Sequence, residues 1–563
     1  MVIIFGLAIL LPFPKNKQER LEASNPPYNE PETNIVPIHP IKSLDNKMLT
    51  ARFRNWALRI LPPGKLLPDR QPAYVASWIY VFGVATLAAL GMVIISGMAL
   101  AIGGADWWHV NPIGHFFNSI HLWGVELFMA FMVIHLWGKF WMAAWRGKRK
   151  LTWITGVVAF LASIVECFTG YLSQQNFDSQ WIATNGKDAI NATGLGSFFN
   201  LMNFGQMLMW HIVLIPIVLV AIVGGHILLV RVHGVAHPIQ KRPKNKAARK
   251  VMENAESMAW LGSTRKYDII KEGAIATVVV FLLVIGLASL LSSPDKPPVT
   301  IESWARVAPA DFMGTADSEL SGTSETANYG PPYNHGTANL QKIGVSWQML
   351  AGVHQSINTA ETFVLSPLSK IAPTDPKLAK ALASYQSASV TQRQAWNKAY
   401  MHVLKNVYFI SGVPKIAKAQ DGPVPTIIAT ELTLAKSGAI DTDLLDQQPF
   451  YGTNYTKPLL FIEDGNYFSS KAKQNHLYGT QWGVMNETGS YPGQPWLWLY
   501  TLWYQLPGFS TSKNVDLIAI YLTAIASILL IAIPFIPGIR DIPRLIPIHK
   551  LIWRNNGHNQ TKP

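Results

Sequence analysis

Two histidines in one apolar stretch are the first candidates for chemistry. Residues 118–142 read NSIHLWGVELFMAFMVIHLWGKFWM, and the pentapeptide IHLWG occurs there twice, at 120–124 and 134–138. His121 and His135 are 14 residues apart, which on a helix is about 21 Å along the axis and roughly 40° around it. The two imidazoles therefore share one face, one near each end. Ligating side chains are costly inside a membrane, so each is a functional candidate.

A second stretch, 206–232, repeats this arrangement with His211 and His226, which are 15 residues apart. If both stretches run in the same direction, His121 meets His211 at one level and His135 meets His226 at the other. Each pair can then clamp one iron, and two imidazoles leave no open coordination position, so the metal would be a low-spin haem that carries electrons. The longer spacing turns His226 by about 60°, and Pro216 offers a kink that could absorb this difference.

Glycines on two neighbouring stretches repeat the histidine spacing. Gly83 and Gly97 lie in the stretch 74–103, Gly156 and Gly170 lie in 152–174, and both pairs are 14 residues apart. A haem is a flat plate, so a helix beside it needs small residues where its backbone approaches the ring. Ordinary glycine-mediated helix packing is the alternative, but the matching period favours two haem sites.

Composition identifies an integral membrane protein. Of 563 residues, 49% are hydrophobic and 14% are charged, and the mean hydropathy is +0.17. Stretches long enough to cross a membrane occur near 74–103, 119–142, 152–174, 206–232, 273–292 and 515–537. The net charge of +14 comes from short runs beside these stretches, so we expect no nucleic-acid partner. Because Cys167 is the single cysteine, the chain has no internal disulfide, no Cys-rich iron–sulfur centre and no covalent haem attachment through Cys-x-x-Cys-His. We expect Cys167 to be a small side chain buried in helix packing.

The basic runs also predict the orientation and the domains. They lie at 52–70, 146–150, 239–250 and in the C-terminal tail, which is one side of the membrane if six spans alternate, so both termini are expected in the cytoplasm. We expect a cytoplasmic segment 1–70, a haem-binding four-helix bundle 71–240, a linker and fifth span 241–292, an extracytoplasmic domain 293–514, and a sixth span with a tail 515–563. Within the domain, 375–411 has helical spacing, and 449–495 is expected to form turns and short strands. Residues 1–12 are left unassigned.

The first four stretches resemble cytochrome b over roughly residues 70–240. The segments KLTWITG (150–156), FTGYLS (168–173) and HILLVRVHGVAHPI (226–239) resemble the family in order and position. The histidine spacings are similar to the short, split form of cytochrome b6f and of Gram-positive complexes. The resemblance implies an all-α transmembrane fold, two non-covalent b-type haems with bis-histidine ligation, and a location in the bacterial cell membrane.

The chain departs from the family pattern at several positions. Arg149 and Arg231 match family arginines on the cytoplasmic side and are expected to pair with the inner haem's propionates, although either could be a simple positive-inside residue. The family arginines around the first histidine are replaced by Asn118 and Leu122. Val81 stands where the short form often has a cysteine, so an extra covalent haem is not supported. LSQQNFDSQW (172–181) replaces the usual Leu-Pro-Trp turn, which predicts an altered outer quinol pocket.

Two carboxylates within the spans are candidates for proton transfer. Glu126 lies one and a half turns beyond His121, and Glu166 lies near the outer end of its stretch. A buried carboxylate is suited to accept a proton released from oxidised quinol. The alternative is a neutral carboxylic acid bonded to a neighbouring helix.

The resemblance implies an electron-transfer subunit of a quinol:cytochrome c oxidoreductase. Electrons would pass from quinol at the outer face through both haems to quinone at the inner face. The implied partners are membrane lipid, a Rieske iron–sulfur protein, a c-type cytochrome and a subunit with the C-terminal part of cytochrome b, in a homodimeric complex. That last subunit is expected because this chain lacks the Pro-Glu-Trp-Tyr motif of quinol oxidation. The alternatives are a dihaem membrane anchor for a periplasmic dehydrogenase or reductase, and a transporter with histidines in a proton path.

Overall fold

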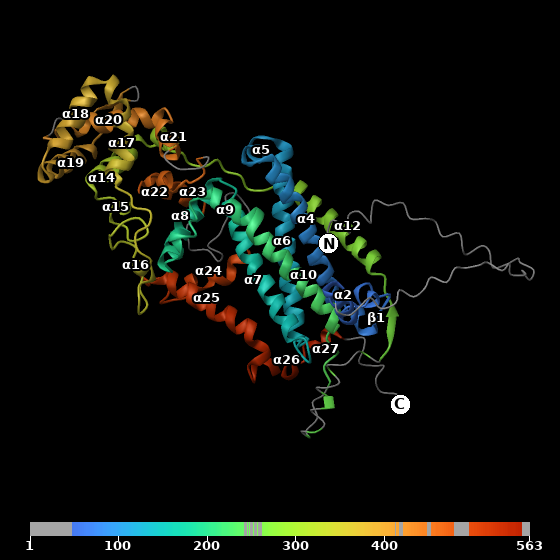
Figure 1. Cartoon of the computed structure of the whole chain (residues 1–563). Coiled ribbons are helices and arrows are strands. Elements are labelled where there is room, and N and C mark those ends of the chain that lie inside the picture. The colour runs from blue at the N-terminus through green and yellow to red at the C-terminus, as the bar shows by residue number, and fades with distance from the viewer. Residues whose placement is uncertain are drawn as a thin grey trace, which may run out of the picture.

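The computed structural model is built almost entirely of helices, of which six are long and apolar enough to span a membrane (Figure 1). It describes residues 48–240, 262–410, 420–446, 452–477 and 495–553, with isolated positions in 245–260 and the strand 413–415. The unassigned N-terminal residues 1–12 lie outside the described part of the chain. The spans are Trp78–Gly103, Pro112–Trp141, Lys150–Leu172, Phe204–His233, Ile269–Leu291 and Val515–Phe535. The expected all-α fold with six spans is confirmed.

The ends of the spans follow from local sequence. Helix α6 (Pro112–Trp141) begins where the Asn111 side chain accepts hydrogen bonds from the backbone N–H groups of Ile113 and Gly114. Helix α12 (Ile269–Leu291) begins at Asp268, which caps it in the same way. The span Phe204–His233 ends before Gly234, whose φ of 67° suits glycine. These polar and glycine caps define the residues at which the spanning helices begin and end.

The spans pack as two pairs with two further helices against them. Helix α4 (Val81–Gly103) packs along α6, and α7 (Lys150–Leu172) packs along α10 (Ile215–His233). Helix α12 lies against α4 and α6, and α25 (Val515–Ala532) lies against α7 and α8 (Phe177–Ala192). We call the membrane face that carries residues 293–514 the domain face, and the opposite face the tail face.

The tail face holds short elements. These are α2 (Leu49–Ile60), α3 (Pro63–Leu66), η2 (Ala73–Ala76), η3 (Trp78–Tyr80), η9 (Ile533–Phe535), η10 (Ile539–Asp541), α26 (Ile542–Leu545), α27 (His549–Ile552) and the antiparallel strands β1 (Arg70–Pro72) and β2 (Thr264–Lys266). Strands β1 and β2 pair Arg70 with Lys266. Helices α5 (Ala105–Val110) and α8 and the turn η4 (Leu195–Ser197) lie between spans on the domain face.

The segment 293–514 is mostly helical. Its elements are α13 (Ile301–Val307), α14 (Pro309–Ser321), α15 (Glu325–Asn328), α16 (Trp347–Ala351), η6 (Ala360–Leu365), α17 (Ser366–Ile371), η7 (Ala372–Thr374), α18 (Pro376–Ser387), α19 (Val390–Leu404), α20 (Val424–Lys436), α21 (Ala439–Asp446), α22 (Thr456–Glu463), α23 (Asn466–Gln474), η8 (Pro495–Leu497) and α24 (Trp498–Gln505). A short antiparallel ladder joins β3 (Tyr408–Ile410) and β4 (Val413–Lys415). The helices expected within 375–411 are present as α18 and α19.

The prediction of turns and short strands over 449–495 is wrong where the structure describes it. Helices α22 and α23 occupy most of 456–474. The glycine, asparagine and tyrosine signals that suggested turns lie at the ends of these helices. Their interiors are buried, with Leu459 and Phe461 both fully enclosed, so tertiary packing overrides the weak local preference.

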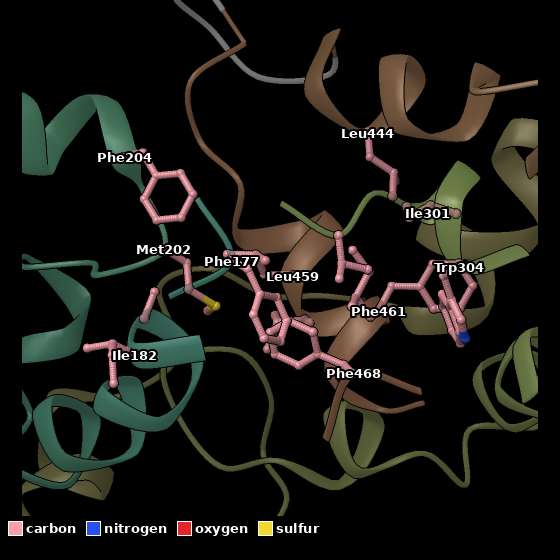
Figure 2. Close-up of a cluster of buried hydrophobic side chains, with 14 of the residues drawn as sticks. Phe177, Ile182, Met202, Phe204, Ile301, Trp304, Leu444, Leu459, Phe461 and Phe468 are labelled. Carbon is pink, nitrogen blue, oxygen red and sulfur yellow. The ribbon is translucent and has the colours of Figure 1, made fainter. Parts of the chain in front are cut away.

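One continuous apolar core joins this segment to the membrane part (Figure 2). Phe177 and Phe204, from the loop region between α7 and α10, lie on one side of it, and Trp304 and Phe461 lie on the other. The ring of Phe177 meets that of Phe468 edge to face, at 5.5 Å between centroids. The segment is therefore packed against the spans rather than tethered only at its ends.

Candidate functional site

The four histidines lie on α6 and on the span that contains α10, at two levels. His121 and His211 are at the level of the domain face, with ring centroids 6.1 Å apart and ring planes perpendicular. His135 and His226 are at the level of the tail face and interact electrostatically. The two levels are about 21 Å apart, since 14 residues of α6 separate them. The structure thus brings the histidines together in the pairs that their spacing predicts.

A π-helical turn adjusts the spacing on the second helix. Residues Trp210–Leu214 form this turn, labelled η5, between α9 (Phe204–Met209) and α10. It contains His211 and ends just before Pro216. One wide turn accommodates one extra residue, so 15 residues that include it cover about the rotation of 14 in a regular helix. The adjustment expected as a kink at Pro216 is therefore made one turn earlier.

Hydrogen bonds from neighbouring helices orient three of the four imidazoles. Nδ1 of His121 lies 3.0 Å from Oγ of Ser96, whose own hydroxyl donates to the Met92 carbonyl. Nδ1 of His226 lies 3.1 Å from Oγ1 of Thr155. Nδ1 of His211 lies 3.0 Å from the backbone carbonyl of Glu166. The sequence did not single out Ser96 or Thr155, because a lone hydroxyl in a span has no distinctive pattern.

These bonds leave the other ring nitrogen of each histidine available. A donor Nδ1–H fixes the tautomer in which Nε2 carries the lone pair for a metal. Within the described ranges, none of the four Nε2 atoms makes a hydrogen bond. Nδ1 of His135 is also buried without a partner. Imidazole nitrogens that make no hydrogen bond keep their lone pairs for a metal, so the donor set is compatible with haem iron.

Each of the four candidate glycines lies directly against one histidine ring. A Cβ added to Gly83 would lie 3.1 Å from Cε1 of His135, and one added to Gly97 would lie 3.1 Å from Cε1 of His121. At Gly156 the distance to Cε1 of His226 would be 2.9 Å, and at Gly170 the distance to Cε1 of His211 would be 2.4 Å. By contrast, an added Cβ would meet nothing within 4 Å at Gly91 on α4 or at Gly224 and Gly225 on α10. The four glycines thus admit the imidazoles between helices.

The carboxylate of Glu166 lies beside a candidate ligand. One of its oxygens is 3.2 Å from Nδ1 of His211, and the other is buried without a hydrogen-bond partner. Glu126 and Glu166 both lie within electrostatic range of Cys167, which places the two predicted proton-transfer residues near each other between α6 and α7. A carboxylate in contact with the far nitrogen of a metal-binding histidine orients the ring and raises its basicity.

The two predicted propionate partners are held differently. Arg149 is buried, and its guanidinium donates to the backbone carbonyls of Gly234 and Glu256, each at 2.9 Å. Arg231 interacts with Tyr267. Lys139, which the sequence reasoning missed, is one turn beyond His135, and its ammonium group lies 4.5 Å from the centre of the Tyr80 ring. A charged residue within the otherwise apolar stretch 119–142 was the sequence signal that could have identified Lys139. The pairing of either arginine with a haem propionate stays a prediction.

A cavity of about 90 Å³ opens beside the domain-face pair. Its lining includes His121, His211, Gly97, Gly170, Asn118, Gln174 and Trp496. Trp496 comes from the far end of the sequence, is 6% exposed, and meets the Tyr171 ring edge to face at 6.4 Å between centroids. The segment after residue 495 thus supplies a wall of this cavity. Sequence reasoning missed this, and the aromatic run PWLWLYTLWY was the signal.

The structure defines a multi-pass, all-helical membrane protein with paired histidines between its spans. Residues 126–298 match the family model described as cytochrome b (N-terminal)/b6/petB. The "Cytochrome bc complex cytochrome b subunit" of Chlorobaculum thiosulfatiphilum is 25% identical over 38% of this chain and 54% of that protein. "Cytochrome b6" of Heliobacterium mobile is 24% identical over 33% of this chain and its whole length. Residues 126–298 of this chain thus match the cytochrome b family, as the resemblance implied.

Two further comparisons concern another bacterial cytochrome b subunit and a solved structure. The "Menaquinol:cytochrome c reductase cytochrome b subunit" of Bacillus subtilis is 23% identical over 30% of this chain and 84% of that protein. A solved chain titled "Hyperthermophilic respiratory Complex III" is 17% identical and covers 69% of this chain and 95% of its own, but at a TM-score of 0.30 it adds nothing to the assignment. The chain spans about half the length of the Chlorobaculum relative. A match to this family implies haem binding and a role in membrane electron transport.

Proposed function

We propose that this chain is the dihaem cytochrome b subunit of a quinol:cytochrome c oxidoreductase of the bc or b6f type. One haem would be held by His121 and His211 and the other by His135 and His226, and when bound they would carry electrons between the two faces of the membrane. The observation that carries the proposal is the repeated unit of two imidazoles with free Nε2 atoms, each ring backed by a glycine.

The side chains around each haem would have separate tasks. Ser96, Thr155 and the Glu166 carbonyl fix the imidazole orientation through Nδ1. Lys139 lies within electrostatic range of His135 and His226 and so supplies a positive charge beside the tail-face haem, where it would stabilise propionates. We retain Arg231 as a second propionate partner.

The cavity beside the domain-face pair is the proposed position of the domain-face haem, because both histidines of the pair and the glycines Gly97 and Gly170 line it. Quinol oxidation is proposed at the domain face next to this haem. Trp496 closes one wall of the cavity from within the same chain. Glu126 and Glu166 are the proposed acceptors of the quinol protons, and Glu166 would also adjust the ligand His211.

The position of basic residues supports the proposed orientation. Arg146, Arg149 and Arg544 lie on the tail face, which would be cytoplasmic, with both termini on that side in a bacterial cell membrane. The segment 293–514 would then be extracytoplasmic. A Rieske protein, a c-type cytochrome and a subunit carrying the C-terminal part of cytochrome b are the proposed partners, in a homodimeric complex.

The test is purification of the native complex from membranes. We expect two b-type haems per chain in the reduced-minus-oxidised spectrum, copurification of a Rieske protein and a c-type cytochrome, and quinol:cytochrome c turnover. Copurification of a periplasmic dehydrogenase or reductase without a Rieske protein would instead favour the membrane-anchor alternative. Absence of an α-band after reduction would contradict both and leave the transporter hypothesis.

A further inference from the structure

Two loops on the domain face expose apolar side chains next to each other. The first, between α8 and α9, exposes Leu195 by 57% and Phe198 by 72%; the second, around α16, exposes Trp347 by 46% and Leu350 by 68%. The loops touch: Gly194 faces the Trp347 carbonyl, and the ring of Phe198 lies 6.2 Å from that of His354. We call these two segments, 194–198 and 343–354, the paired apolar loops.

The paired apolar loops are free of charged residues over an unusual length. No Asp, Glu, Lys or Arg occurs from 192 to 210 or from 343 to 360. Ile343, Val345 and Met349 add to the exposed apolar surface, being 40%, 47% and 49% exposed. Contiguous apolar surface of this kind marks a contact with a partner or a membrane.

Hydrogen bonds fix the second loop against the sixth span. The side-chain oxygen of Gln341 accepts from the backbone N–H groups of Asp516 and Leu517, and the backbone N–H of Lys342 donates to Asn514 at 2.8 Å. The indole N–H of Trp347 donates to the hydroxyl of Tyr521 at 2.6 Å. These bonds hold the loop and the residues just before it against the span, while Val345, Met349 and Leu350 stay exposed.

The contact with Tyr521 sets the depth of the loop. Tyr521 is six residues inside α25, which begins at Val515, and this is about 9 Å along the helix axis. The span Val515–Phe535 has 21 residues, or about 31 Å, close to the thickness of a hydrocarbon core. The Trp347 side chain thus lies deeper in the membrane than Val515, the first residue of the span. Tryptophan and tyrosine side chains concentrate at this interfacial depth.

From these observations we infer that the paired apolar loops insert into the membrane leaflet on the domain face and anchor the segment 293–514 to the lipid surface. Lipid, rather than a soluble partner, is the occupant that an uncharged apolar surface at this depth suits. Met209, on the span that follows the first loop, is 53% exposed, so apolar exposure is also found on the adjoining helix. Because the backbone must keep its hydrogen bonds, only side chains enter the leaflet.

The anchor has a structural consequence. The segment 293–514 is joined to spans α12 and α25 at its ends and to α8 by the common core. A fourth attachment, through lipid, would hold it at a fixed height and tilt above the membrane. This fixes the distance between the domain and the cavity beside His121 without requiring another subunit.

The test measures lipid contact in the full-length chain in lipid nanodiscs. In a Cys167→Ser background, nitroxide labels are placed by Phe198→Cys and Leu350→Cys, and collision rates with oxygen and with a water-soluble nickel chelate are compared. Ile528→Cys on α25, 64% exposed, is the lipid-facing control; Val390→Cys at the start of α19, 61% exposed, is the aqueous control. We expect the oxygen-to-nickel ratio at 198 and 350 to lie well above that at 390 and between the values at 390 and 528. Equality with 390, or exclusion of both reagents, overturns the proposal.

A second measurement needs no substitution. The unmodified chain is reconstituted with phospholipid that carries a photoreactive group in its acyl chain, and cross-linked peptides are identified by mass spectrometry. We expect cross-links within 194–198 and 343–354 as well as in the spans. Cross-links confined to the spans would refute the anchor, and neither result depends on the proposed haem chemistry.

Discussion

The glycines beside the histidines predict a graded loss of haem when a methyl group is added. Ordinary Cβ contacts begin at 3.4 Å, so Gly170→Ala, with 2.4 Å to His211, requires the imidazole to move by about 1.0 Å. Gly156→Ala requires about 0.5 Å, and Gly83→Ala and Gly97→Ala about 0.3 Å. Metal–ligand distances are held to within about 0.2 Å. Gly170→Ala should therefore lose the domain-face haem, whereas Gly83→Ala, whose shift exceeds this tolerance by only about 0.1 Å, should keep most of both haems.

The assay is haem content per chain, measured by pyridine haemochrome after purification, with the reduced α-band to show which haem remains. Gly91→Ala and Gly224→Ala are matched controls, because neither added methyl meets an atom within 4 Å. Alanine favours a helix over glycine by about 1 kcal/mol, so weaker helices cannot explain a loss. Full haem loading in Gly170→Ala, or equal losses in Gly170→Ala and Gly91→Ala, would refute the steric argument.

Two other predictions follow from carboxylates. At a pH high enough to ionise Glu166, Glu166→Gln removes a negative charge 3.2 Å from Nδ1 of His211 and should raise the midpoint potential of the domain-face haem by on the order of 40 mV, equivalent to about 1 kcal/mol. An unchanged potential in a redox titration at that pH would show that the carboxylate does not influence the ligand. In the segment 293–514, burial raises the pKa of Asp317 to about 8, and neither of its oxygens has a hydrogen-bond partner. The folded state therefore holds this proton more tightly than the unfolded chain, so stability should fall as pH rises from about 4 to 8. Asp317→Asn should weaken that dependence in thermal unfolding of the full chain, and an identical pH profile would contradict the assignment.

The positions of the haem-site residues could be predicted because helix geometry fixes them. The 14-residue repeat of His121 and His135, and of the glycines on α4 and α7, places side chains at fixed heights and angles. Hydropathy gives the order and direction of the spans. From these alone one can predict which histidine of one span meets which histidine of the other, without knowing how the side chains pack. The structure brings these residues together as that reasoning predicts.

The partners of these residues could not be predicted in the same way. Whether Ser96 or Thr155 meets a histidine depends on the rotation and offset between two helices, which one sequence does not encode locally. The π-helical turn at His211 likewise depends on the balance between Pro216 and interhelical packing. Trp496 is more than 300 residues from Tyr171 in sequence, and only the tertiary fold brings their rings to 6.4 Å.

The central claim is that two bis-histidine haems are held by His121 with His211 and by His135 with His226. The most direct measurement is haem content and low-temperature EPR of the four single His→Ala variants, with His233→Ala on α10 as the control. We predict that the variants at 121 and 211 lose one and the same low-spin signal, that those at 135 and 226 lose the other, and that the control keeps both. Loss of different signals within a pair, or no low-spin haem in the unsubstituted chain, would contradict the account.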